Sequence, residues 1–138
     1  MTENQIGTAV VELAIEIHRE LGPGLYENVY ETVLAYELES HGLAVVRQVP
    51  VPIRYKHLEF QEGFKADMIV NDKVILELKS VETITKSHKK QLLTYLRLKG
   101  FKLGYLLNFG EALMKDGIYR IVNNLEEDVQ QTSLTQSR

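Results

Sequence analysis

The stretch that decides the fold is Phe64-Lys65-Ala66-Asp67-Met68-Ile69-Val70, followed by Asn71-Asp72-Lys73 and then Val74-Ile75-Leu76-Glu77-Leu78-Lys79. Its pattern is that of two apolar β-strands joined by a short turn, with two acids and a lysine inside. Charged side chains in strand interiors cost free energy unless something compensates them. Two carboxylates and an ammonium group held close together can bind a divalent metal ion and activate water. The hairpin therefore predicts both a sheet and a candidate chemical site.

The turn of this hairpin decides which side chains meet, because side chains alternate between the two faces of a strand. A two-residue turn at Asn71-Asp72 would set Asp67 opposite Leu76 and mix polar with apolar residues on both faces. A three-residue loop at Asn71-Asp72-Lys73 sorts the faces, and Asn and Asp tolerate the left-handed conformation that such loops use. We therefore predict the three-residue loop. It pairs Val70 with Val74, Met68 with Leu76 and Ala66 with Leu78 on an apolar face, and Ile69 with Ile75, Asp67 with Glu77 and Lys65 with Lys79 on the other.

The second face of this register carries like charges, because Asp67 lies directly opposite Glu77. Carboxylates in that position repel each other and raise the pKa of one of them. A Mg²⁺ or Mn²⁺ ion between them removes the repulsion and is suited to oxygen ligands. Lys79 shares the face and can orient a water or stabilise negative charge on a phosphate. The alternative is a solvated face on which Lys79 neutralises an acid, but Ile69 and Ile75 on the same face favour a partly covered cleft.

Length and composition indicate one compact domain. The chain has 138 residues, of which 44% are hydrophobic and 25% charged, and its formal net charge is −3. We expect a single domain over residues 1–125 and a polar tail over 126–138 that frays. The absence of cysteine excludes disulfides, thiolate metal sites and cysteine nucleophiles. The first residues lack the pattern of a signal peptide, and no apolar run is long enough to span a membrane, so we expect a cytoplasmic protein without membrane contact.

Periodicity and breakers along the chain predict a sheet with helices packed on it. Pro50 and Pro52 mark the first strand as an edge strand or a bulged one. Short turns favour antiparallel pairing of the first three strands, and the last helix favours a parallel, right-handed crossover to a central strand. The predicted fold class is therefore α/β, or α+β-like, with a mixed sheet of four to five strands in the order ααβββαβ(β). Helices are expected over residues 4–21, 27–41 and 84–99, strands over 45–55, 64–70, 74–79, 102–108 and 117–123, and a turn over 57–63.

The start of the second predicted helix holds another acid. Glu27, Tyr30 and Glu31 share one side of this helix, because they are spaced by three and four residues. In the first turn, Glu27 can stabilise the helix through its dipole. It can instead reach into the cleft as a third carboxylate, and spacing alone leaves both roles open.

The helix after the hairpin carries a polar line of His88, Gln91 and Tyr95 beside a line of leucines. Chain order sets its first half over the acidic face, so His88 and Gln91 can contact a phosphate, a water or Lys79; the alternative is that they are ordinary exposed side chains. Lys89 belongs to a basic run that can contact a nucleic-acid backbone, although such runs are more often only solvated. The phosphate-loop, dinucleotide, zinc-protease and serine-hydrolase motifs are absent from the sequence.

Taken together, these residues resemble a known family. Asp67, then Glu77-x-Lys79 on a hairpin, then a helix bearing Gln91, is similar to the PD-(D/E)XK nuclease superfamily. Because the chain also has Gly24-x-x-Glu27-x-x-Tyr30, it resembles more closely the bacterial GxxExxY proteins, a family placed in that superfamily. The likeness covers residues 6–122, with Ala66 in place of the proline that often precedes the first acid. Other typical segments are Leu21-Gly22-Pro23-Gly24-Leu25-Tyr26, Gln91-Leu92-Leu93-Thr94-Tyr95-Leu96 and Leu107-Asn108-Phe109-Gly110.

The resemblance implies a restriction-endonuclease-like core of helix, three strands, helix and strand. It also implies that Asp67 and Glu77 bind a Mg²⁺-type ion, with Glu27 as the helix-borne acid near the metal. By the same likeness, Lys79 assists the attacking water and Gln91 supports the site. Further candidates for substrate contact or support are Tyr30, His88, Tyr95 and Lys89.

We therefore expect a Mg²⁺- or Mn²⁺-dependent nuclease that acts on nucleic acid, with DNA ahead of RNA. The alternative is a module that binds nucleic acid or protein without turnover, which the small size and acidic net charge favour. A third reading is a subunit that is active only as a homodimer or with a partner protein, the first helix supplying the contact.

Overall fold

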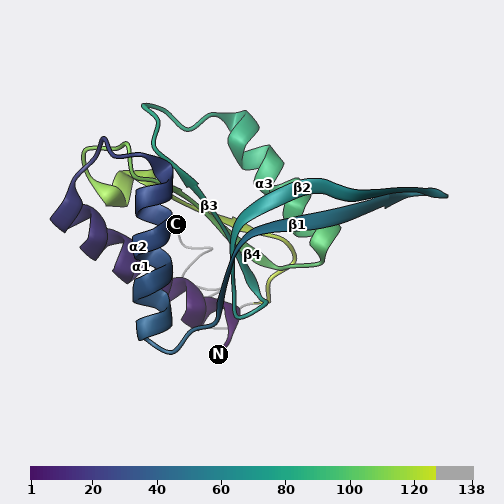
Figure 1. The fold of residues 1–138 in the computed structure, drawn as a ribbon, viewed down its shortest axis with the longest axis horizontal. Coiled ribbons are helices and arrows are strands. Elements are labelled where there is room, and N and C mark those ends of the chain that lie inside the picture. The colour runs from purple at the N-terminus through teal and green to yellow at the C-terminus, as the bar shows by residue number, and fades with distance from the viewer. Residues whose placement is uncertain (127–138) are drawn as a thin grey trace.

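The computed structural model describes residues 1–126, and apart from Glu126 the predicted tail lies outside the described residues. The described part contains three α-helices, a short 3-10 helix and a five-stranded sheet (Figure 1). The helices are α1 (Glu3–Leu21), α2 (Glu27–Ser40), α3 (Lys86–Lys99) and the 3-10 helix η1 (Met114–Gly117). The strands are β1 (Val45–Tyr55), β2 (Leu58–Val70), β3 (Val74–Lys79), β4 (Leu103–Asn108) and β5 (Ile118–Val122).

The strands lie in the order β1-β2-β3-β4-β5. Strands β3 and β4 are parallel, and the other three neighbouring pairs are antiparallel. This mixed sheet with its flanking helices confirms the predicted fold class and the predicted parallel pairing of the two strands that α3 connects. The central strand is β3, however, and not the strand that follows α3. The prediction was wrong on this point. All six residues of β4 are buried, as is typical of a central strand, but only β5 lies beyond β4 in the sheet.

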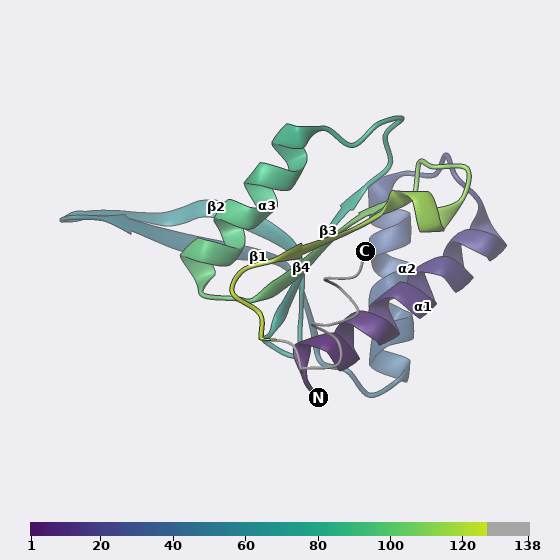
Figure 2. The same cartoon turned by 180° about the vertical axis from the view of Figure 1, so that it is seen from behind.

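The helices cover the two faces of the sheet and bury two separate cores. Helices α1 and α2 pack on one face and α3 on the other, as the two opposite views show (Figures 1 and 2). Alternate residues of β3 divide between them, since Leu76 lies in the core under α1 and α2 whereas Ile75 lies in the core under α3. We call these the first core and the second core.

Helix α1 forms where the sequence predicts it. Thr2 caps it through a capping box with Gln5, and Gly22 ends it with a φ of 74° that favours glycine. The apolar residues that it buries in the first core at spacings of three and four are Ile6, Val10, Leu13 and Ile17. The apolar side of this helix, which the sequence offered as a surface for a partner, is thus used inside the protein.

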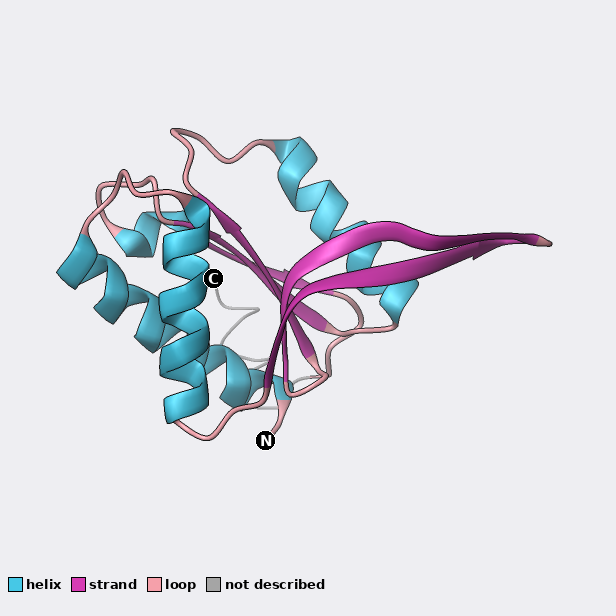
Figure 3. Cartoon of the chain, viewed as in Figure 1, coloured by secondary structure: helices cyan, strands magenta, loops and turns pink. Residues whose placement is uncertain are grey.

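Strands β1 and β2 continue well beyond the body of the molecule as a two-stranded arm (Figures 1 and 3). The predicted turn over residues 57–63 is therefore wrong, because β2 begins at Leu58. The polar run Gln61-Glu62-Gly63 suggested a turn, but cross-strand pairs of Ile53 with Phe60 and Tyr55 with Leu58 extend the strands. A register shift between Val51 and Ile53 confirms that β1 is a bulged edge strand.

The hairpin of β2 and β3 has the predicted three-residue loop. Val70 pairs with Val74, Ile69 with Ile75 and Met68 with Leu76. The ladder ends at that last pair, so the expected backbone pairs of Asp67 with Glu77, Ala66 with Leu78 and Lys65 with Lys79 are not formed. Ala66 is buried in the second core, not in the first as predicted. In addition, no helix in the described part of the chain is long and apolar enough to cross a membrane.

Candidate active site on the second face of the hairpin

The turn of the hairpin sets the register of the site. Asn71 and Asp72 both have positive φ, at 50° and 53°, and the N–H of Lys73 donates to the carbonyl of Val70 at 3.0 Å. Asn71 is also tied to the residue before β1, because the N–H of Ala44 donates to its Oδ1 at 2.8 Å. The polar turn residues are thereby anchored, and the register they impose sends Asp67 and Glu77 to the same face.

Asp67 lies where β2 leaves the ladder with β3. Its Oδ2 accepts a hydrogen bond of 2.9 Å from the backbone N–H of Leu78. A carboxylate thus takes the place that a backbone carbonyl would hold in a continued ladder. The Asp67 side chain is anchored against β3 through one oxygen, beside Glu77.

Glu77 is a buried acid in the middle of the sheet. It is 8% exposed, and its Oε1 has no hydrogen-bond partner among residues 1–126. Burial, a hydrogen bond with Asp67 and repulsion from the Asp67 charge raise the pKa of Glu77 from 4.5 to about 9, although the nearby Lys79 lowers it. Without a cation, Glu77 is therefore protonated at neutral pH. An orphaned buried carboxyl oxygen of this kind calls for a partner that residues 1–126 do not supply.

A small cavity of about 260 Å³ contains both acids. Strands β2, β3 and β4 form its floor, and α3 forms its wall. Most of its lining is polar or charged, including the half-buried Lys79. The described residues that line it are Lys65, Asp67, Glu77, Lys79, His88, Gln91, Leu92, Tyr95 and Leu106.

Helix α3 brings the predicted line of His88, Gln91 and Tyr95 to this cavity. The ring of Tyr95 stacks on Phe64 at a centroid distance of 3.8 Å, which holds the tyrosine in the cavity lining. Burial and the Glu77 charge raise the pKa of Tyr95, while a hydrogen bond from Gln91 lowers it. Tyr95 is therefore a hydroxyl donor near the acids rather than a base.

His88 has a structural partner as well as a place in the cavity. Its backbone N–H donates to the Thr85 hydroxyl at 3.2 Å, and its Nδ1 accepts from the N–H of Thr85 at 3.1 Å. This capping box starts α3 at Lys86, two residues later than predicted. Lys89 is not among the described residues that line the cavity, and its Nζ lies 4.4 Å from the ring centroid of Tyr119 on β5.

Tyr30 organises the loop before α2. It is fully buried and stacks on Phe109 at 4.4 Å, and its hydroxyl donates to the carbonyl of Gly22 at 2.6 Å. The same hydroxyl accepts from the N–H of Leu25 at 3.1 Å. Ser80, which directly follows β3, donates to the carbonyl of Leu25 at 2.8 Å. Tyr30 therefore holds the loop near the end of β3 and is placed for support rather than for contact with a substrate.

Glu27 is the first residue of α2, directly after this loop, and its side chain is exposed. It does not line the cavity of Asp67 and Glu77. Within residues 1–126, no group of three acids and histidines is close enough to hold a metal ion. The role of Glu27 as a third metal ligand therefore stays a prediction.

Sequence reasoning missed two contributors to the site. Lys65 lines the cavity; the predicted register already set it on the face of Asp67, but it was not named as a site residue. Phe64 supports Tyr95 by stacking, and only the packing of α3 on the sheet reveals that contact.

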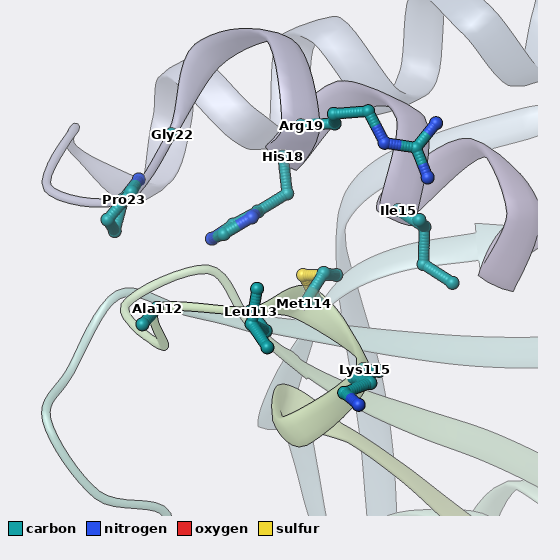
Figure 4. Close-up of a pocket in the computed structure, with 9 residues that line it drawn as sticks. All are labelled: Ile15, His18, Arg19, Gly22, Pro23, Ala112, Leu113, Met114 and Lys115. Atoms are coloured by element: carbon teal, nitrogen blue, oxygen red, sulfur yellow. The ribbon is translucent and has the colours of Figure 1, made fainter.

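A second cavity, of about 520 Å³, lies between the end of α1 and the segment around η1 (Figure 4). His18 points toward this segment, and its Nε2 lies 2.8 Å from the carbonyl of Glu111. The described residues that line this cavity include no carboxylate. It therefore lacks the oxygen donors of the smaller cavity.

Fold and cavity together define an α+β protein with an acidic, lysine-bearing pocket on its central hairpin. A family model described as the PD-(D/E)XK nuclease superfamily matches residues 4–121. The match spans most of the chain, and the protein belongs to this superfamily. Among curated proteins, no match to the chain is found. Nucleases of the superfamily generally use divalent metal ions.

Proposed function

We propose that the protein is a Mg²⁺- or Mn²⁺-dependent nuclease that hydrolyses phosphodiester bonds in nucleic acid, with DNA as the preferred substrate. The observation that carries this proposal is the pair of acids in the cavity. Asp67 is anchored through one oxygen, and Glu77 has a buried oxygen without a partner in the described part of the chain. Lys79 follows Glu77 by two residues and lines the same cavity.

The residues present fit a divalent metal ion. Two carboxylates supply the hard oxygen donors that Mg²⁺ and Mn²⁺ prefer. The orphaned Oε1 of Glu77 gains a partner when a cation binds, and the positive charge favours the ionised form that burial disfavours. Asp67 and Glu77 would hold the ion, and Glu27 is the candidate third ligand. When bound, such an ion lowers the pKa of water and neutralises charge on a phosphate.

The other side chains of the cavity have complementary roles. The Lys79 ammonium group donates to the reacting phosphate or to the attacking water and balances the charge that develops. Gln91 is exposed at the mouth, where its amide can orient a phosphodiester. Tyr95, held by its stack on Phe64, lines the same cavity and keeps a hydroxyl donor near the two acids.

The proposal is tested by assaying cleavage of single-stranded, duplex and branched DNA, and of RNA, with Mg²⁺ or Mn²⁺. We expect Asp67→Ala and Glu77→Ala each to lower the rate by about a thousandfold, because loss of the ion removes several kcal/mol of transition-state stabilisation. Glu39→Ala, an exposed acid near the far end of α2, is the matched control and should cleave as the wild type does. Cleavage that survives both cavity substitutions would sink this mechanism.

A module that binds nucleic acid or protein without turnover is the second candidate. The exposure of Glu27 and its absence from the cavity favour it, because two acids make a weaker ion site than three. Calorimetric titration with Mn²⁺ separates the two functions. Metal binding at Asp67 and Glu77 supports the nuclease, whereas nucleic-acid binding without metal binding supports the module.

A further inference from the structure

Strand β2 is released from both neighbouring strands at Asp67. On the β1 side, Arg47 pairs with Met68 and Val49 with Ala66, but the intervening pair of Gln48 with Asp67 is missing from the ladder. On the β3 side, the last residue of β2 that pairs is Met68, the neighbour of Asp67 on the side of the turn. Within the described residues, Asp67 therefore has no paired residue in the ladder with either strand. A break on both sides at one acid of the cavity needs a physical cause.

Gln48 is the cause on the β1 side. Its φ is 51°, which is the left-handed region, in the middle of an otherwise extended strand. A residue with a β-carbon is strained in this region and stays there only when its surroundings impose the conformation. Glutamine has no special tolerance for this region, unlike the Asn71 and Asp72 of the hairpin turn. Something must therefore hold Gln48 in place.

A buried carboxylate on α2 holds it. The Nε2 of Gln48 donates to Oε1 of Glu31 at 2.6 Å, and the Nε of Arg47 donates to Oε2 of Glu31 at 2.9 Å. Glu31 is 6% exposed, so both of its oxygens need these partners. Loss of the Gln48 amide would leave a buried oxygen unpaired, which opposes a return of Gln48 to regular strand geometry.

The same hydrogen bonds fix the position of α2 relative to the sheet. Glu31 lies four residues after Glu27, one helical turn further along α2. The helix that carries the third predicted acid is thus tied to the strand next to Asp67. We call Glu31, Arg47 and Gln48 the Glu31 clamp.

We propose that Gln48, held by the Glu31 clamp, is a positioning residue for the cation site. Its left-handed backbone keeps β1 from pairing with Asp67, so that the Asp67 carboxylate can turn to the N–H of Leu78 and leave its second oxygen for a cation beside Glu77. A regular ladder would fix Asp67 in strand geometry instead. This inference rests on the proposed function, because it assumes that Asp67 and Glu77 bind a metal ion.

The test compares the affinity for Mn²⁺ of the wild type, Gln48→Val and Gln48→Gly by titration calorimetry on the full chain. Valine strongly disfavours positive φ, whereas glycine adopts it without strain. We expect Gln48→Val to raise the Kd for Mn²⁺ by about tenfold or more, as substitutions behind metal ligands do. Gln48→Gly should weaken binding less. Wild-type affinity in a folded Gln48→Val protein would overturn the inference.

Two controls keep the outcome interpretable. Gln61→Val places valine at an exposed glutamine further out on β2 and should leave the Kd unchanged. If circular dichroism shows that Gln48→Val does not fold, Gln48→Ala takes its place with the same expected direction. If the wild type binds Mn²⁺ and the Gln48 variants bind it equally well, only this inference fails. If the wild type binds no Mn²⁺, the proposed function fails and the inference with it.

Discussion

The two faces of the β2–β3 hairpin are built from alternate residues of the same strands, yet they do opposite things. The first face carries Met68, Val70, Val74, Leu76 and Leu78, all buried in the first core under α1 and α2. The second face carries Ile69 and Ile75 near the turn, and further along the strands Asp67, Glu77 and Lys79, which line the cavity beside α3. One face stabilises the fold by burying apolar surface, whereas the other lowers the stability because it buries an acid.

The difference teaches where a small protein can hold a buried charge. Glu77 lies in the central strand, so its backbone is fixed on the β4 side by a parallel ladder that runs through Lys79. The apolar residues on either side of it in the chain, Leu76 and Leu78, are almost completely buried in the first core. The rigid apolar face therefore fixes the position of the charged one. Substitutions on the two faces should have separable effects.

The largest expected effect on stability comes from the apolar face. Leu76→Ala should lower the free energy of unfolding by about 2–5 kcal/mol, because Leu76 is fully buried and the change leaves a cavity. Urea unfolding followed by circular dichroism measures this. The control Gln61→Ala, at an exposed position of β2, should stay within about 0.5 kcal/mol of the wild type. Equal losses in both variants would contradict the contrast between the two faces.

The next effect concerns the charged face and depends on pH. The folded protein keeps the Glu77 proton up to about pH 9, whereas the ordinary value for the group is 4.5. Between these values the Glu77 site binds more protons in the folded state than in the unfolded state, so in EDTA its contribution to stability is fully present below the lower value and is lost as the pH rises. The slope approaches about 1.4 kcal/mol per pH unit.

Glu77→Gln should flatten this slope, because glutamine does not titrate, and added Mn²⁺ should reduce it in the wild type by favouring the ionised acid. Urea unfolding at about pH 6 and about pH 8 measures both effects. Glu39→Gln, at an exposed position, should leave the slope as it is. A wild-type slope that equals that of Glu77→Gln would show that Glu77 is ionised in the folded protein.

A smaller effect is expected at Tyr30, a polar group on the side of the first core. Tyr30→Phe should cost about 1–3 kcal/mol, because it removes the hydroxyl that bonds the carbonyl of Gly22 and the N–H of Leu25. The stack on Phe109 is kept. Denaturant unfolding measures the loss, and the Kd for Mn²⁺ should change less than in Gln48→Val. A larger change in metal affinity would show that Tyr30 contributes to the metal site on the second face.

The smallest effect lies in the turn that sets the two faces. Asp72→Gly should stabilise the protein by up to about 1 kcal/mol, since it creates an Asn-Gly turn at a position with a φ of 53°. Asp72→Val should destabilise the protein, because valine disfavours that φ. Thermal unfolding of the two variants tests the sign of the difference. The same sign for both would mean that the turn conformation contributes little.

Much of the fold follows from local sequence patterns, and the failures have a common origin. The three-residue loop was predictable because only one register sorts apolar from polar residues, and the capped helices followed from their periodicity. The arm was missed because Gln61, Glu62 and Gly63 resemble a turn, while the pairing that makes them a strand comes from Ile53 and Tyr55 on another strand. Pairing partners distant in the chain cannot be read from a local window.

The candidate site divides in the same way. The sequence by itself determined that Asp67, Glu77 and Lys79 share one face and that His88, Gln91 and Tyr95 follow on a helix over it, because side-chain alternation and helical spacing are local geometry. Only the tertiary structure decided that the ladder stops at Asp67, that Glu77 keeps a buried oxygen without a partner in the described chain, and that Glu31 holds Gln48 in a left-handed conformation. Burial and hydrogen-bond partners depend on segments that packing brings together from distant parts of the chain.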